Sequence, residues 1–163
     1  MTIEELTEIA EDFLANTYGL SLDIPIKRND RLRTVMGRYI STWKDDIPDR
    51  IEIAGYMFKY ADPSIIVDTL KHECIHYALH VKGEPNADGH PHFESELSRN
   101  GVGSTGTNKV GTYVVYECTK CEKVAEARGK RLLRDHRDRV TRCCRAEIRI
   151  KGERIYTGTE AVS

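Results

Sequence analysis

The sequence predicts an α+β protein built from two modules. Apolar residues recur at helical spacing in residues 3–14 and 63–82, and strand-like runs occupy residues 24–27, 34–40 and 50–54. The last third instead carries two close cysteine pairs and another strand-like run at residues 113–116. We therefore expect an α+β domain over residues 1–109 and a small β module over residues 110–163.

The sequence predicts a helix first and then three strands. The helix carries its apolar residues on one face and ends toward Gly19, so it should pack on the core as an amphipathic helix. Charged turns separate the three strands that follow. In hydrolases that bind an extended substrate, a sheet edge can pair with it by strand addition, and the sequence does not indicate which strand would do so here.

The second helix is predicted over residues 63–82. Asp62 suits the N-cap, Pro63 suits the first helical position, and Gly83 provides a stop. His72 and His76 fall roughly opposite an apolar stripe and are flanked by further apolar residues, so they should face a partly dry cleft. The stripe consists of Ile66, Leu70, Cys74, Tyr77, Ala78 and Val81, in which Cys74 is a small core residue.

The pentapeptide from His72 to His76 has the form H-E-x-x-H. On a helix, residues four apart share a face, so both imidazoles can bind one zinc ion while Glu73 points toward the water that the ion holds. These residues predict two metal ligands and a general base for zinc-assisted hydrolysis. The alternative, a chance meeting on a buried helix, is disfavoured by the predicted helix ends and by the histidines that follow.

A catalytic zinc needs a third protein ligand, and the candidates follow the helix. Residues 83–92 form a turn-rich loop that would return His90 and His92 toward the helix face. We favour His90 as the ligand, with His92 beside it or in solvent, and Glu94 or Glu96 as replacements if the loop geometry differs. His80 continues the row of histidines but lies too far along the helix to bind the same ion.

The length and composition of the chain limit the classes of protein to which it can belong. The chain has 163 residues and a formal net charge of −1, which fits one domain with a small appendage. Five cysteines, an odd number, argue against a secreted disulfide framework. There is no long apolar run and no basic-then-apolar N-terminus, so we expect neither a membrane span nor a secretory signal, and a cytoplasmic location.

The C-terminal module is predicted to be basic. Residues 100–109 are linker-like, and residues 118–154 contain thirteen cations against six anions. This surplus has two interpretations: a solvated hairpin, or a patch that binds nucleic-acid phosphates without base specificity. Its densest part consists of Arg128, Lys130, Arg131, Arg134, Arg137, Arg139 and Arg142, with few aromatic residues for base stacking.

The four cysteines of this module resemble a zinc ribbon. Cys118 and Cys121 have the spacing of a zinc knuckle, and a second pair after a hairpin would complete a tetrahedral, structural zinc site. Cys143 and Cys144 are adjacent, however, and adjacent thiolates wrap an ion less easily. Either one of them binds alongside His136, or the site is weak, or the ribbon has lost its metal.

Together these parts resemble the SprT-like family, which includes bacterial SprT-like proteins and the eukaryotic protease Spartan. The resemblance is carried by the first helix, residues 29–39, the H-E-x-x-H helix, the Gly89-His90 turn before Phe93 and the cysteine module. It covers nearly the whole chain. It implies a zincin-like minimal metalloprotease domain followed by a zinc-ribbon-like module.

The same resemblance implies roles for individual residues. His72, His76 and His90 would bind the catalytic zinc, and Glu73 would be the general base. Spartan-type members cleave proteins crosslinked to DNA, which would give the basic module a purpose. The turn after His90 is one residue shorter than the Spartan pattern His-Gly-x-x-aromatic, which keeps His92 open as the ligand.

Two other functions fit the same sequence. In the first, the protein is a non-catalytic nucleic-acid-binding protein in which zinc only holds the fold. In the second, it is a hydrolase whose substrate is not a protein, because H-E-x-x-H specifies hydrolysis more firmly than it specifies a peptide bond.

Overall fold

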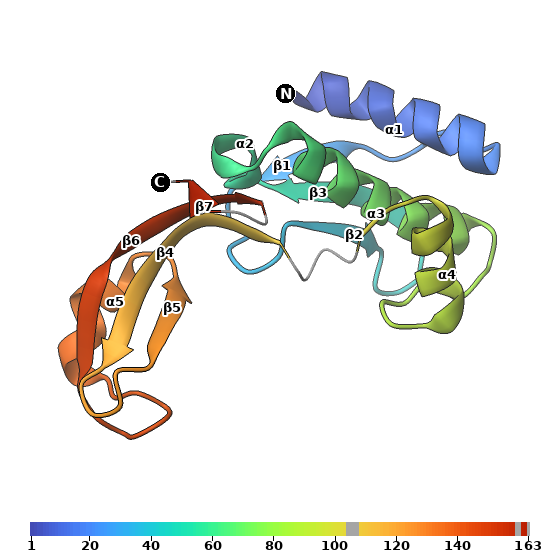
Figure 1. The fold of residues 1–163 in the computed structure, drawn as a ribbon. Coiled ribbons are helices and arrows are strands. Elements are labelled where there is room, and N and C mark those ends of the chain that lie inside the picture. The colour runs from blue at the N-terminus through green and yellow to red at the C-terminus, as the bar shows by residue number, and fades with distance from the viewer. Residues whose placement is uncertain (104–107, 159–160, 163) are drawn as a thin grey trace. The chain divides into compact units, whose positions relative to one another are not determined.

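A computed structural model describes residues 1–103, 108–158 and 161–162 of the chain. They form two compact units, Met1–Thr107 and Asn108–Ser163 (Figure 1). The first combines helices with a three-stranded sheet, and the second is built on a four-stranded sheet, so the predicted α+β fold class is confirmed. Part of the predicted linker, residues 104–107, lies outside the described residues.

The first helix, α1 (Ile3–Tyr18), begins with a capping box. The Thr2 hydroxyl accepts from the main-chain N–H of Glu5, and the Glu5 carboxylate accepts from the N–H of Thr2. The helix ends at Gly19, whose φ of 66° is the left-handed conformation that glycine adopts at low cost. Its buried residues are Leu6, Ala10 and Leu14, and it packs along α3 (Figure 1).

The sheet of the first unit has the strand order β1-β3-β2. Its strands are β1 (Ile26–Asn29), β2 (Gly37–Ser41) and β3 (Pro48–Ala54), with β1 parallel and β2 antiparallel to β3. All three predicted strands are present, but the first two begin two or three residues later than expected. The order makes β2 an edge strand, a property that the sequence did not reveal.

The central strand β3 carries a different kind of residue on each face. Ile51 and Ile53 are fully buried in the core. Glu52, on the other face, accepts hydrogen bonds from Arg38 at 2.8 Å and Arg50 at 2.7 Å, and from Asn29 at 2.6 Å. Because Asn29, Arg38 and Glu52 lie on β1, β2 and β3 respectively, this carboxylate ties the whole sheet together.

After the short α2 (Met57–Tyr60), the helix α3 (Pro63–Val81) contacts α1, β2, β3 and the following helix α4 (Pro91–Arg99). Pro63 is its first residue, as predicted, but the side chain of Asp62 makes no capping hydrogen bond. The carbonyl of Asp62 accepts from Ile65 and Ile66 instead. The central position of α3 agrees with a helix that is apolar on two sides.

The helix α4 packs on α3 through a small apolar cluster. The cluster consists of Ile75, Leu79, Phe93, Leu97 and Val102. It fixes the start of α4, and with it the loop of residues 82–90, beside the histidines of α3.

The second unit is an antiparallel sheet with the strand order β5-β4-β6-β7. Its elements are β4 (Lys109–Cys118), β5 (Val124–Arg128), α5 (Arg131–Asp135), the 3-10 helix η2 (His136–Asp138), β6 (Ile148–Gly158) and β7 (Ala161–Val162). Across the described parts of both units, none of the helices combines the length and apolarity needed to cross a bilayer.

Candidate functional site

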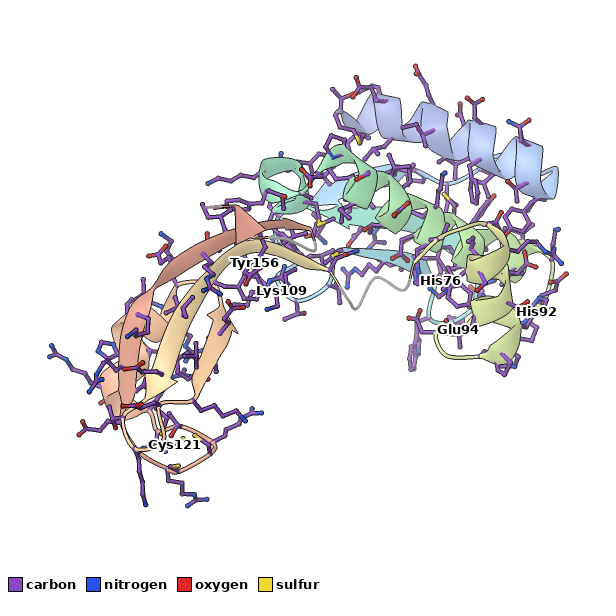
Figure 2. All side chains as sticks on the ribbon, viewed as in Figure 1. His76, His92, Glu94, Lys109, Cys121 and Tyr156 are labelled. Carbon is purple, nitrogen blue, oxygen red and sulfur yellow. The ribbon has the colours of Figure 1, made fainter. Side chains whose placement is uncertain are left out.

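The two predicted zinc ligands on α3 converge on one point. The Nε2 atoms of His72 and His76 are 3.2 Å apart, and the two rings meet edge to face. Both side chains are largely buried, with His72 only 4% exposed. Figure 2 labels His76 on α3 and Glu94 on the neighbouring helix α4. The H-E-x-x-H segment therefore forms the helical metal motif that the sequence predicts.

A third donor comes from the loop of residues 82–90. Oδ1 of Asp88 lies 3.1 Å from Nε2 of His72 and 3.4 Å from Nε2 of His76. Ligand atoms about 2.0–2.2 Å from a tetrahedral zinc are separated by about 3.3–3.6 Å. The separations of the three donors are close to that spacing, so these residues fit a zinc ion.

The two histidines predicted as candidates for the third ligand have other partners in the structure. His90 is the N-cap of α4, where its Nδ1 accepts from the N–H of His92 at 3.2 Å, and it is not in the group formed by His72, His76 and Asp88. Nε2 of His92 lies 2.6 Å from the carboxylate of Glu84. His90 as the third ligand stays a prediction.

The two acidic alternatives also have partners of their own. Glu94 accepts from the N–H of Gly89, and Glu96 accepts from the hydroxyl of Tyr18. Sequence reasoning missed Asp88, although it lies in the same turn-rich loop, two residues before His90. The signal that could have indicated Asp88 is its carboxylate, a possible metal ligand, so close in the sequence to the expected ligand His90.

The surroundings of the two histidines set their protonation. Nδ1 of His76 lies 2.5 Å from the carbonyl oxygen of Asn86, which can only accept, so Nδ1 carries the proton and Nε2 keeps its lone pair. Burial is the main cause that lowers the pKa of both His72 and His76, which favours the neutral form that binds metals. Nδ1 of His72 is buried and has no partner among the described residues.

Phe93 completes the apolar wall of this site. Its ring stacks on His76 with the centroids 4.1 Å apart and meets His72 edge to face at 5.2 Å. Phe93 is fully buried, so α4 excludes water from one side of the histidine pair. The burial of the two histidines against Phe93 agrees with the partly dry surroundings that the pattern of α3 predicts.

Glu73 is held between α3 and the edge strand β2. Its Oε2 accepts from the main-chain N–H of Tyr39 at 2.7 Å, and the residue is only 5% exposed. This burial raises the pKa of the Glu73 carboxyl to about 8, against the opposing effect of the Tyr39 hydrogen bond. A proton on this carboxyl is therefore exchangeable near neutral pH in the metal-free protein.

The close approach of β2 to α3 depends on Gly37. A Cβ atom at this position would lie 2.8 Å from Cγ2 of Thr69 and 3.1 Å from Oε1 of Glu73. The first distance is shorter than real Cβ contacts allow, so only glycine fits without a shift. No pattern in the sequence indicates that β2 and Glu73 meet here.

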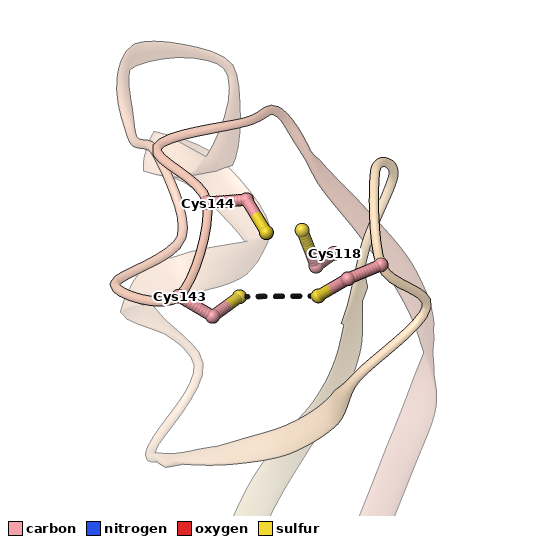
Figure 3. A group of neighbouring side chains, drawn as sticks. Cys118, Cys143 and Cys144 are labelled. Atoms are coloured by element: carbon pink, nitrogen blue, oxygen red, sulfur yellow. Dashed lines mark hydrogen bonds between the residues drawn. The ribbon is translucent and has the colours of Figure 1, made fainter.

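The second candidate metal site is the cysteine group of the C-terminal unit. The sulfur atoms of Cys118, Cys121, Cys143 and Cys144 all lie within 4.8 Å of one another (Figure 3). Cys121 and Cys143 are 3.5 Å apart, close to the roughly 3.8 Å between sulfurs on a tetrahedral zinc. The C-terminal β sheet and its four clustered cysteines are consistent with a zinc ribbon.

The adjacent cysteines reach the group because of a tight turn. The N–H of Thr141 donates to the carbonyl of Ala146, and the N–H of Arg145 donates back to the carbonyl of Thr141. Arg145 directly follows the pair and has a φ of 51°, in the left-handed region. This turn brings both sulfurs toward the first pair, without the two-residue spacing that a knuckle has.

His136 does not join the cysteines. Its Nδ1 lies 3.1 Å from the carbonyl of Leu133. Within the group, a hydrogen bond from Thr141 and the N–H groups of Cys121 and Lys120 lower the pKa of Cys118 to about 6. Cys118 is thus readily a thiolate, the form that binds zinc.

The basic residues of the second unit are partly neutralised. Glu126 pairs with Lys109 and Arg154, and Lys109 also lies 4.9 Å from the centre of the Tyr156 ring (Figure 2). Asp135 pairs with Arg131 and Arg139, while Arg149 and Lys151 share Glu117. Arg134, Arg137 and Arg142 have no ion-pair partner among the residues that the structure describes.

Comparison with known proteins places the chain in a family. The model of the SprT-like family matches residues 3–102. The protein named Protein SprT-like from Staphylococcus carnosus (strain TM300) is 30% identical over 95 residues, which cover 58% of this chain and 57% of that protein. Its namesake from Staphylococcus aureus (strain MRSA252) is 29% identical over 129 residues, or 74% of this chain and 80% of that protein.

A Protein SprT-like from Staphylococcus epidermidis (strain ATCC 12228 / FDA PCI 1200) is 27% identical over 122 residues, which cover 72% of this chain and 78% of that protein. No solved structure matches the chain. The family match spans more than half of the sequence and includes the whole H-E-x-x-H helix with its following loop. The chain therefore belongs to the SprT-like family.

Proposed function

We propose that the chain is a zinc-dependent metallopeptidase that hydrolyses peptide bonds. The observation that carries this proposal is the triangle of donors from His72, His76 and Asp88, with Glu73 on the same helix. A bound zinc ion supplies an acidified water and a Lewis acid for the scissile carbonyl. SprT-like family membership supports the proposal, since the family is related to metalloproteases.

The remaining roles in the proposed reaction belong to residues of the chain. The Nε2 atoms of His72 and His76 would hold the ion, together with Asp88 or the predicted His90. Glu73 would act as general base: its Oε2 accepts from the N–H of Tyr39, which would leave its Oε1 to accept a proton during hydrolysis. Burial raises the pKa of this carboxyl in the metal-free protein, and the positive charge of a bound zinc ion would favour the ionised form that a general base needs.

A protein substrate is supported by the position of β2. This strand is an edge of its sheet, and its residues are half-buried or exposed. An extended peptide can add to such an edge through main-chain hydrogen bonds, which do not depend on side-chain identity. We assign the binding of the peptide to main-chain groups of β2 other than the Tyr39 N–H, which Glu73 occupies, because this strand contacts Glu73 directly.

Nucleic acid is the proposed second partner. Arg134, Arg137 and Arg142 remain available for phosphates, and binding would follow counterion release without base specificity. Proteins attached to DNA, including crosslinked ones, are then the proposed substrates. A basic surface on the same chain as a peptidase unit would raise the local concentration of such substrates.

The test compares zinc-loaded wild type with Glu73→Gln on a flexible protein substrate, with and without single-stranded DNA. We expect the variant to keep its zinc and lose cleavage. Full activity in the variant would end the peptidase proposal. Salt-sensitive DNA binding without any proteolysis would instead support a non-catalytic nucleic-acid-binding protein, and hydrolysis of a non-protein substrate would support another hydrolase.

A further inference from the structure

His80 continues the row of His72 and His76 along α3, yet its ring makes a bridge of its own. Its Nε2 lies 2.8 Å from the carbonyl oxygen of Asp46, and its Nδ1 lies 3.0 Å from the hydroxyl of Tyr39. Tyr39 belongs to β2, and Asp46 belongs to the turn that joins β2 to β3. One ring therefore connects α3 to two points of the edge strand and its turn.

The two contacts of His80 determine where its proton lies. The carbonyl of Asp46 can only accept, so Nε2 donates to it. In the neutral ring, Nδ1 is then an acceptor, and the Tyr39 hydroxyl donates to it. Both polar atoms of the ring are satisfied, and the ring also meets that of Tyr39 edge to face at 5.6 Å.

The turn that His80 contacts is itself well ordered by hydrogen bonds. Thr42 and Ile47 exchange hydrogen bonds, with the N–H of Thr42 donating to the carbonyl of Ile47 and the N–H of Ile47 donating to the Thr42 hydroxyl. The Ser41 hydroxyl donates to the carboxylate of Asp46 at 2.6 Å. His80 thus binds to a fixed point and not to a freely moving loop.

Tyr39 links this bridge to the general base. Its hydroxyl is held by His80, while its main-chain N–H donates to Oε2 of Glu73 at 2.7 Å. The neighbouring Gly37 already lets β2 lie directly on α3 at Glu73. A shift of Tyr39 away from α3 would therefore remove the N–H that orients the carboxylate.

We infer that His80 is a positioning residue: it holds Tyr39 so that the Tyr39 N–H keeps Glu73 in place. This inference rests on the proposed function, in which Glu73 is the general base. Loss of the bridge leaves the zinc donors untouched but lets the carboxylate rotate. The chemical step should then slow, so kcat falls while KM changes little.

The experiment uses the zinc-loaded full chain. His80→Phe keeps a planar ring but removes both nitrogens, Tyr39→Phe removes only the hydroxyl, and His80→Asn keeps an acceptor near the Nδ1 position. Tyr60→Phe is the matched control, because Tyr60 lies on α2, which carries none of the site residues. The readouts are zinc content, kcat and KM for a flexible protein, and hydrogen exchange at the Tyr39 amide.

We expect His80→Phe and Tyr39→Phe to bind one catalytic zinc as wild type does, to lose about tenfold or more in kcat, and to exchange the Tyr39 amide at least about tenfold faster. His80→Asn should recover much of both properties. Unchanged exchange at Tyr39 in His80→Phe overturns the inference, whatever the activity. If wild type and Glu73→Gln are equally inactive, the peptidase proposal fails, while the exchange rates still decide whether His80 holds Tyr39.

Discussion

The carbonyl oxygen of Asn86 lies 2.5 Å from Nδ1 of His76, so the loop that presents Asp88 to the site also fixes the tautomer of a candidate metal ligand. Asp88, another candidate ligand, and Asn86, the partner of His76, are only two residues apart in the chain. Movement of this short loop should alter both, which makes it the part of the site most sensitive to substitution.

The first prediction concerns the third ligand. Asp88→Ala should weaken zinc binding by about a hundredfold or more, because loss of a mere partner of a ligand already costs about 10–100-fold. His90→Ala and His92→Ala should have small effects, since both rings have other partners. Competition with a chromophoric chelator measures the affinities. A large loss in His90→Ala alone would show that the loop rearranges on metal binding and that the ligand predicted from the sequence is the correct one.

The second prediction concerns Gly37. Gly37→Ala should push β2 away from Thr69 and Glu73, lower cleavage about tenfold or more, and destabilise the fold by about 1–3 kcal/mol through overpacking. Zinc affinity should not change. Gly103→Ala is the matched control, because a Cβ there meets no atom of the described residues within 4 Å. Equal effects of the two substitutions on thermal unfolding and kcat would contradict the tight contact.

The third prediction uses the raised pKa of Glu73. In the metal-free folded protein the carboxyl keeps its proton up to a pKa of about 8, whereas the unfolded chain releases it near 4.5. The folded state therefore binds more protons between these values, and stability falls as pH rises through this window, by up to about 1.4 kcal/mol per pH unit.

Glu73→Gln should remove this loss of stability at rising pH, because the amide does not titrate. The melting temperature of the metal-free variant should exceed that of wild type by an amount that grows from pH 5 to 8 and then levels off. His72 and His76 titrate in both proteins, so their contribution largely cancels in the difference. Thermal unfolding at five pH values measures it, and a constant difference would mean that Glu73 is not buried as a protonated carboxyl.

The fourth prediction concerns the cysteine group. Wild type should bind two zinc ions per chain, and Cys143→Ser and Cys144→Ser should each bind one, because both sulfurs lie in the same group. Cys74→Ala is the control: it removes a buried thiol outside the group and should retain both ions. Elemental analysis counts the metal. Retention of two ions in either serine variant would leave that cysteine without a role as a ligand.

The fifth prediction concerns nucleic acid. Replacing Arg134, Arg137 and Arg142 with alanine should weaken binding to single-stranded DNA of any sequence. The slope of log K against log salt should fall by up to about 0.7 for each phosphate that the variant no longer neutralises. Arg149→Ala should matter less, since Arg149 is paired with Glu117 at 2.7 Å. A salt slope identical to that of wild type would exclude these arginines as phosphate ligands.

Local patterns predicted much of this protein, and long-range contacts did not. The helix α3, its ligands and the cysteine pairs depend on spacings within a few residues, which a sequence displays directly. The meeting of Gly37 and Tyr39 with Glu73 depends on strand order and on how β2 lies against α3, across more than thirty residues. No periodicity encodes that meeting, so the strand that touches the base could not be identified beforehand.

Loop geometry was the other limit. Asp88 and His90 lie on the same turn-rich segment, and composition cannot tell which side chain a turn directs toward α3. The same applies to Cys143 and Cys144, for which the left-handed Arg145 shapes the turn. A positive φ at a residue other than glycine has little sequence signal.

Under the proposed function, the short edge strand β2 would affect how protein substrates are chosen. It comprises Gly37–Ser41, and its pairing with β3 is irregular between Ile40 and Ser41. A guest strand can align with only a few residues, and it must arrive with its own main-chain groups unpaired. Folded proteins meet that condition mainly at termini and frayed loops. The choice of substrate would then depend on local disorder in the target protein and not on its sequence. Fully folded proteins nearby would not be cleaved.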